Sequence, residues 1–147
     1  MTQEQKNLLF KDLCMRLPYG VKVEIKYYDD AWELLAIYTN GTTYAARDIG
    51  YPIETYSENC KPYLFPLSSM TEEQFEELKV FADLTYEGNT LELVEWNDNC
   101  KTLEFWLEEI PSHCVIKVFD WLNKNHFDYR GLIPMGLAID ATGKNIY

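Results

Sequence analysis

Apolar residues recur at helical spacing at the beginning of the chain. The stripe contains Leu9, Phe10, Leu13, Cys14 and Leu17. Because residues three and four positions apart share one face of a helix, this spacing predicts an amphipathic helix that ends near Leu17. Thr2 and Gln5 have the spacing of a capping box at its first turn, and Pro18-Tyr19-Gly20 stops it.

Alternation of apolar and polar residues predicts three strands after this helix. Between residues 21 and 27, Val, Ile and Tyr alternate with Lys and Glu, and residues 32–39 are rich in strand-forming types. Asn40-Gly41 is favoured in two-residue hairpin turns because both positions accept a positive φ, so residues 42–46 should return antiparallel. We therefore expect a meander whose apolar face is covered by the N-terminal helix.

Three prolines break up the residues that follow the meander. Pro52, Pro62 and Pro66 interrupt short apolar runs between residues 47 and 69. A proline lacks the N–H that a central strand donates, so we expect an edge strand and a buried connector in this region.

Two more helices are predicted in the second half of the chain. Thr71 begins a second capping box, and the inner face of this helix should consist of Phe75, Leu78, Phe81, Ala82 and Thr85. Pro111-Ser112 marks the entry to another helix, whose apolar face should contain Val115, Val118, Phe119 and Leu122. Alternating residues over 91–108 predict a second hairpin between these two helices.

Together these elements define an α+β fold. It consists of an N-terminal helix, an antiparallel β-meander over about residues 21–46, and two further helices with a probable second hairpin. The length of 147 residues is typical of one domain, and the sequence contains no repeat, low-complexity tract or long linker. We therefore predict a single domain over residues 1–147.

The net charge of −11 is concentrated in the middle of the chain. Residues 51–100 carry 2 Lys or Arg against 11 Asp or Glu, whereas residues 1–50 carry 6 against 7 and residues 101–147 carry 5 against 6. Such a surface repels phosphate backbones, so we expect no nucleic-acid partner, and it attracts a basic protein surface. The alternative interpretation, that this charge only keeps an aromatic-rich chain soluble, stays open.

Hydropathy and cysteine spacing predict a soluble protein of the cytoplasm. No window approaches the roughly 18 apolar residues of a membrane helix, and the first residues are polar rather than signal-like. Cys14, Cys60, Cys100 and Cys114 include no CxxC pair, so we expect reduced thiols, three of them near large apolar residues. We expect no cofactor, metal or membrane partner.

Three stretches resemble a family of small acidic bacterial proteins. They are LLFKDLCMRLPYGVKV at 8–23, CKPYLFPLSSMTEEQFEEL at 60–78 and FDWLNKNHFDYRGLIPMGLAI at 119–139. The family is frequent in gut anaerobes and their phages or mobile elements, and it has no assigned activity. The resemblance implies an intracellular accessory protein that acts on a host or phage component, and it transfers no catalytic or ligand residue.

The sharpest hypothesis for an enzyme uses Cys114 as nucleophile and His126 as base. Cys114 follows His113 at the predicted start of a helix, where a thiol pKa is lowered. Adjacent helical residues point about 100° apart, which places His113 badly for Cys114. A structural interpretation competes, because Val115 and Ile116 lie next to the thiol and a core cysteine is expected there.

Two other groups of residues are candidates for binding. Glu72, Glu73, Glu76 and Glu77 occupy the first two turns of the second predicted helix. They suit a basic partner or a hard cation, and equally a solvated turn that complements the helix dipole. A second group combines donors, acceptors and rings, and contains His126, Asp128, Tyr129 and Arg130. It suits a binding surface or, as the alternative, a capped and inward-packed turn.

The sequence thus favours a non-enzymatic accessory or adaptor protein that binds another protein through an acidic surface. The charge segregation and the missing linear catalytic motif motivate this hypothesis. Two alternatives stay open: a hydrolase-like enzyme with a dispersed Cys/His site, and a structural or assembly protein of a virion.

Overall fold

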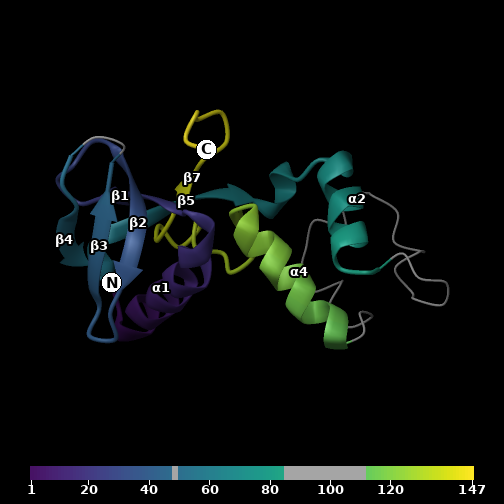
Figure 1. Cartoon of the computed structure of the whole chain (residues 1–147), viewed down its shortest axis with the longest axis horizontal. Coiled ribbons are helices and arrows are strands. Elements are labelled where there is room, and N and C mark those ends of the chain that lie inside the picture. The colour runs from purple at the N-terminus through teal and green to yellow at the C-terminus, as the bar shows by residue number, and fades with distance from the viewer. Residues whose placement is uncertain (48–49, 85–111) are drawn as a thin grey trace. The chain divides into compact units, whose positions relative to one another are not determined.

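The computed structural model describes residues 1–47, 50–84 and 112–147 (Figure 1). They form two compact units, one built from residues 1–64 and 130–147 and the other from residues 65–129. The mixed α+β class is confirmed, while the single domain stays a prediction. Within the described residues, no helix combines the length and the apolar character that a bilayer crossing requires.

The first unit begins with helix α1, Gln3–Arg16. The capping box is confirmed: the Gln5 backbone N–H donates to Thr2 Oγ1 at 3.2 Å, and the Thr2 N–H donates to Gln5 Oε1 at 2.9 Å. A 3₁₀ turn over Leu17–Tyr19 follows the helix, and Gly20 then adopts a φ of 65°. Glycine accepts this left-handed conformation without the steric cost of a Cβ, so the chain leaves the helix here.

Four antiparallel strands form the meander and its edge. They are β1 Lys22–Ile25, β2 Ala31–Ile37, β3 Thr42–Ala46 and β4 Ile53–Tyr56. The register between β2 and β3 shifts at a bulge between Leu34 and Ala36. Strand β4 pairs with β3 and lies at the edge of the sheet, which confirms the expected meander and edge strand (Figure 1).

The buried connector predicted after the edge strand is wrong. A 3₁₀ turn over Ser57–Asn59 leads into strand β5, Cys60–Pro66, which places Pro62 opposite Val23 of β1. On its other side β5 pairs in parallel with β7, Ile139–Asp140. A proline removes one ladder donor but keeps an extended backbone, and the buried side chains of this strand outweigh that loss.

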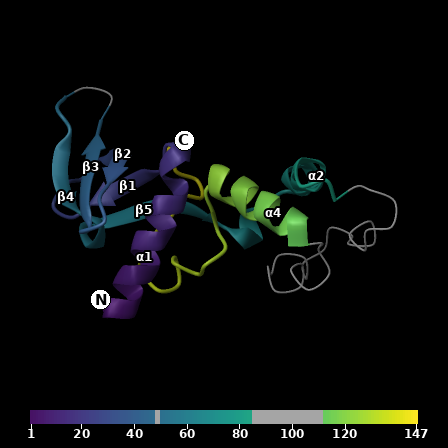
Figure 2. The same ribbon diagram turned by 60° about the horizontal axis from the view of Figure 1, so that its bottom comes forward.

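Helix α1 covers one face of the sheet, as predicted (Figure 2). The core of the first unit consists of Leu9, Leu13, Val21, Val23, Ile25, Trp32, Leu34, Ala45 and Cys60. The leucines come from two successive turns of α1 and the strand residues alternate, because helix and strand periodicities each place their apolar side chains on one face. Burial of this face against the helix stabilises both elements.

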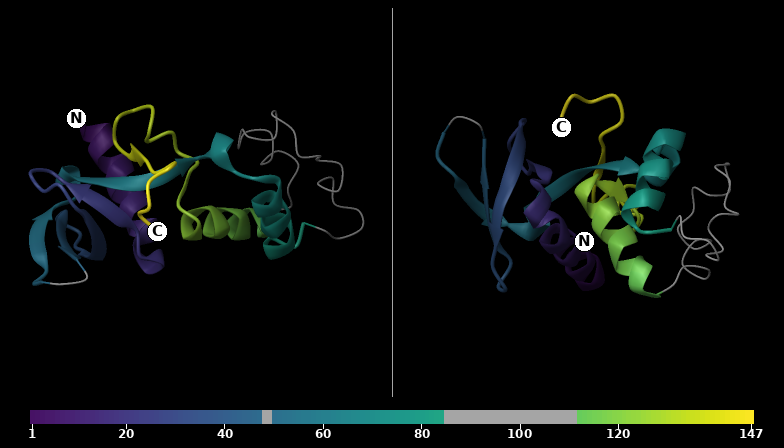
Figure 3. Two further views of the ribbon diagram at one scale, coloured as in Figure 1. Left: turned by 90° about the horizontal axis from the view of Figure 1, so that it is seen from above. Right: turned by 45° about the vertical axis from the view of Figure 1, so that its right-hand side comes forward.

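The second unit packs helix α2, Glu72–Phe81, against helix α4, Ser112–Lys124 (Figure 3). A 3₁₀ turn over Leu67–Ser69 precedes α2, and the two-residue strand β6, Phe127–Asp128, pairs in parallel with the end of β5. The core consists of Met70, Phe75, Leu78, Ala82, Leu84, Cys114, Val118, Trp121, Leu122 and Phe127.

Most of the predicted apolar faces of these helices are found in the core. Phe75, Leu78 and Ala82 are buried, and Val115 and Phe119 pack against the core from partly exposed positions. Phe81 is an exception, since it is 39% exposed at the last turn of α2. Thr85 and the predicted hairpin over 91–108 lie outside the described residues.

Candidate functional site

The two units differ sharply in charge. The sequence of the second unit, residues 65–129, contains 14 Asp or Glu and 4 Lys or Arg, whereas the first unit contains 10 and 9. The acidity that the sequence places in the middle of the chain is therefore a property of one compact unit. Opposite charges approaching this unit are attracted over about a Debye length, roughly 8 Å at physiological salt.

Helix α2 presents four of these carboxylates to solvent. The Gln74 backbone N–H donates to Thr71 Oγ1 at 3.2 Å, and the Gln74 side chain accepts from the Thr71 N–H at 2.9 Å, which fixes the first turn. The exposed carboxylates are Glu72, Glu73, Glu76 and Glu77. Their positions complement the positive end of the helix dipole and also leave them accessible to a cationic partner.

A groove of about 620 Å³ lies beside this acidic turn. Its lining residues are Glu76, Glu77, Val80, Phe81, Trp121, Lys124 and Asn125. All of them belong to the second unit, and they come from α2 and from the end of α4. The groove therefore combines apolar surface with carboxylates on the α2 side.

The apolar part of the groove is exposed at the end of α2. Val80 is 66% exposed and Phe81 is 39% exposed, whereas Trp121 is 3% exposed and contributes the floor. The Lys124 ammonium lies 6.0 Å from the centroid of the Phe81 ring, so a cation stands on the α4 side. Helical spacing predicts Phe81 on the inner face. Spacing alone does not show where a neighbouring helix ends, so it could not predict the exposure of this side chain.

Lys79 forms an ion pair within α2. Its ammonium lies 2.6 Å from a carboxylate oxygen of Glu76 and 5.1 Å from the centroid of the Phe75 ring. This i,i+3 pair neutralises part of the charge of Glu76. Glu77, the other carboxylate that lines the groove, directly follows Glu76 in the same helix.

The second group of candidate binding residues is largely buried. His126 and Asp128 are each 7% exposed, and His126 has a φ of 58° at the turn that follows α4. The His126 carbonyl accepts a hydrogen bond from the Phe65 N–H at 2.9 Å, which joins the turn to β5. The Tyr129 hydroxyl donates to Asn123 Oδ1 at 3.0 Å. These positions favour the structural interpretation of the three residues.

Arg130 belongs to the first unit and contacts helix α1. Its Nε lies 3.3 Å from Asp12 Oδ1, and its Nη2 lies 2.7 Å from the Met15 sulfur. The structure therefore gives Arg130 a packing partner in α1.

The proposed nucleophile and base, Cys114 and His126, do not meet. Cys114 lies in the first turn of α4 with no exposed surface, and His126 follows the end of the same helix. At 1.5 Å per residue, the helix separates the two positions by about 15 Å along its axis. A base must lie within about 3 Å of the thiol, so this pair forms no catalytic dyad.

The cysteines divide into buried and exposed thiols. Cys60 has no exposed surface, and desolvation raises its pKa from 9.0 to about 12. Cys14 is exposed, although its spacing assigns it to the apolar stripe of α1. Cys100 lies outside the described residues.

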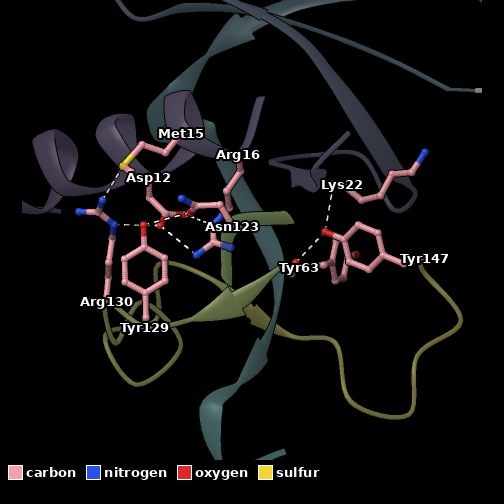
Figure 4. A network of polar contacts seen from close by, with 9 residues as sticks. All are labelled: Asp12, Met15, Arg16, Lys22, Tyr63, Asn123, Tyr129, Arg130 and Tyr147. Atoms are coloured by element: carbon pink, nitrogen blue, oxygen red, sulfur yellow. Dashed lines mark hydrogen bonds and ion pairs between the residues drawn. The ribbon is translucent and has the colours of Figure 1, made fainter. Parts of the chain in front are cut away.

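Two polar networks of the first unit were missed by sequence reasoning (Figure 4). Asp12 and Arg16 form a buried ion pair on α1. The Lys22 N–H donates to the Tyr147 hydroxyl at 3.2 Å, and this hydroxyl donates to the Tyr63 carbonyl at 2.8 Å. The i,i+4 spacing of Asp12 and Arg16 beside the leucine stripe is a sequence signal that could have predicted their ion pair. No sequence signal predicts the contacts of Tyr147.

Among the described residues, no group of three or more His, Cys, Asp or Glu side chains is arranged to hold a metal ion. No protein-family model, no curated protein and no solved structure matches the chain.

Proposed function

We propose that this chain is a non-enzymatic accessory or adaptor protein of the cytoplasm that binds a basic surface of another protein. The contact is made by the acidic second unit, with the four exposed glutamates of α2 at its centre. The observation that carries the proposal is the segregation of charge: 14 Asp or Glu against 4 Lys or Arg in residues 65–129. The resemblance to a family of small acidic proteins of gut anaerobes and their phages or mobile elements, which has no assigned activity, implies an accessory role of this kind.

Stability alone gives a weak reason for this concentration of charge. Like charges at i,i+4 positions of one helix are mutually destabilising by a few tenths of a kcal/mol, and Glu72 and Glu73 stand in this relation to Glu76 and Glu77. The helix dipole compensates only within the first turn. A basic partner supplies the missing compensation and is also steered to the surface, so association is fast and depends on salt.

The test is a pull-down with the tagged full chain from lysate of the native host, at low and at high salt, read by mass spectrometry. We expect one basic protein to co-purify near stoichiometrically at low salt and to be lost at high salt. A variant that replaces Glu72, Glu73, Glu76 and Glu77 by Gln should lose it as well. Failure to recover any protein at either salt would refute the proposal.

A matched control separates this surface from charge in general. Glu4 and Asp29 are exposed carboxylates of the first unit, and their replacement by Asn or Gln changes net charge without touching α2. The Glu4→Gln, Asp29→Asn variant should retain the partner, whereas Glu76→Gln with Glu77→Gln, which removes the same two charges from α2, should weaken binding. If it loses the partner as readily as the α2 variant, overall charge and not this surface determines binding.

A further inference from the structure

We propose that the groove between α2 and the end of α4 receives one basic amphipathic segment of the partner protein. This inference rests on the proposed function and specifies the chemistry of the partner at the site. The apolar side chains of the segment enter the groove, and its Lys or Arg residues contact the carboxylates of α2. Helix-in-groove recognition of this kind uses exposed apolar anchors flanked by charge.

The apolar part of the inference comes from the last turn of α2. Val80 and Phe81 are 66% and 39% exposed although they lie only two and three positions after the buried Leu78, and Trp121 forms the floor beneath them. Covering apolar surface gains roughly 25 cal/mol for each Å² removed from water, so an aliphatic or aromatic side chain seated here contributes to affinity. Aromatic side chains at the centre of an interface are typical of binding hot spots.

The charged part of the inference identifies which segment fits. Glu76 and Glu77 line the α2 side of the groove, and the unit that contains them carries 14 acidic against 4 basic residues. The negative field repels an anionic segment and does not attract a neutral one, whereas it attracts a cationic segment. Charge complementarity therefore selects a basic occupant.

Lys124 gives the groove a direction. Its ammonium, 6.0 Å from the Phe81 ring, is the cation that α4 contributes to the lining, whereas α2 contributes the carboxylates of Glu76 and Glu77. The basic residues of the segment should therefore face α2, and its uncharged edge should face Lys124. Replacing Lys124 by an acid should strengthen binding of a basic segment, which a purely structural role of Lys124 would not do.

The experiment uses the full chain and three synthetic helical peptides of equal length. One carries Lys and Leu on opposite faces, one replaces Leu by Ser, and one replaces Lys by Glu. Binding is measured by calorimetry, and the Trp121 indole signal in ¹H–¹⁵N spectra shows whether the groove is occupied. We expect the Lys/Leu peptide to shift this signal and to bind at least tenfold more tightly than the other two.

Two variants of the chain complete the test. The Val80→Ser, Phe81→Ser variant should lose about tenfold in affinity for the Lys/Leu peptide, and Lys124→Glu should gain several-fold. Circular dichroism verifies that the first variant is folded. Lys124→Glu changes an exposed residue and keeps the test decisive if the first variant does not fold.

The outcomes separate this inference from the proposed function. If the Lys/Leu and Lys/Ser peptides bind equally and neither variant changes affinity, the groove is not used and this inference fails, while a salt-sensitive acidic surface stands. If the Glu/Leu peptide binds as tightly as Lys/Leu, charge selects nothing and the inference also fails. Absence of binding by all three peptides overturns it as well.

Discussion

Asp12 and Arg16 form an ion pair on α1 in which neither side chain has exposed surface. Arg16 Nε lies 2.8 Å from Asp12 Oδ2, and Arg16 Nη2 lies 3.2 Å from Oδ1, so the contact is bidentate. Arg130 adds a second guanidinium at 3.3 Å from the same carboxylate (Figure 4). Such geometry is required because desolvating two charges costs several kcal/mol for each ion.

Removing one partner of this pair should therefore destabilise the first unit strongly. We expect Asp12→Ala to lower the free energy of unfolding by about 3–5 kcal/mol, because Arg16 would be left buried without its carboxylate. Replacing both residues, as in Asp12→Leu with Arg16→Met, should recover much of the loss. Urea denaturation measures these differences.

The exposed ion pair between Lys6 and Glu58 provides the control. Its side chains are 39% and 44% exposed, so Glu58→Ala should change the free energy of unfolding by about 1 kcal/mol or less. A cost for Asp12→Ala no larger than that of Glu58→Ala would show that Asp12 and Arg16 are solvated.

Thr71 should determine whether the acidic turn of α2 is ordered. Its hydroxyl and the Gln74 side chain satisfy two backbone N–H groups, so Thr71→Ala should cost about 1 kcal/mol. Amide exchange should become faster in the first turn of α2, while Thr71→Ser should preserve both stability and protection. Equal exchange in Thr71→Ala and the unmodified chain would contradict a capping role.

The parts of the fold that sequence predicts are those encoded by neighbouring residues. The capping boxes of Thr2 and Thr71 depend on residues three positions apart. A hairpin also turns at Asn40-Gly41, but the two-residue type is wrong: the Tyr38 N–H donates to the Thr42 carbonyl, so three residues form the loop, and only Gly41 has a positive φ, 86°. Strand β5 did not follow from sequence, because its pairing with β1 depends on residues nearly forty positions away. In the sequence, Pro62 counts against a central strand. In the fold, the buried apolar side chains of β5 and its pairing with β1 favour the strand despite the proline.

The candidate site was predictable only in part for the same reason. The exposure of Glu72 and Glu77 follows from helical spacing on α2. The groove depends on Lys124 and Trp121 of α4, which lie forty or more positions from the α2 residues of the groove, and on the exposure of Phe81 in the last turn of α2. The hypothesis of a Cys114–His126 dyad is wrong because the length of α4 separates the two residues.

The cysteines should react in the order of their exposure. Cys14 is exposed, whereas Cys60 and Cys114 have no exposed surface. In the native chain at neutral pH, iodoacetamide should modify Cys14 far faster than the other two, as read by peptide mass spectrometry. Denatured chain gives the control, because all three should then react alike. A Cys114 that reacts faster than a model thiol would restore the nucleophile hypothesis.

Tyr147 should hold together the edges of β1 and β5. Its hydroxyl accepts from the Lys22 N–H at 3.2 Å and donates to the Tyr63 carbonyl at 2.8 Å. Tyr147→Phe keeps the ring but leaves both backbone groups without this partner, so stability should fall by about 1–3 kcal/mol. The Lys22 amide should also exchange faster with solvent. Unchanged exchange at Lys22 would mean that water replaces the hydroxyl without loss.

Alkaline pH should destabilise the first unit through Cys60. Burial raises the pKa of this thiol from 9.0 to about 12, so the folded chain retains a proton that the unfolded chain releases. Stability from this group is therefore complete below pH 9.0 and is lost as pH rises toward 12, by at most about 1.4 kcal/mol for each pH unit. Burial also raises the pKa of the Tyr147 hydroxyl, which acts in the same direction at higher pH.

Two substitutions assign this alkaline slope to its source. Cys60→Ala removes the buried thiol, so the free energy of unfolding should fall less steeply just above pH 9.0, before the phenols ionise. Cys14→Ser changes an exposed thiol and should leave most of the slope in place. Urea denaturation across this pH range measures both. Equal slopes for Cys60→Ala and the unmodified chain would mean that the Cys60 thiol ionises freely in the folded state, and that solvent reaches the junction of α1 with the sheet.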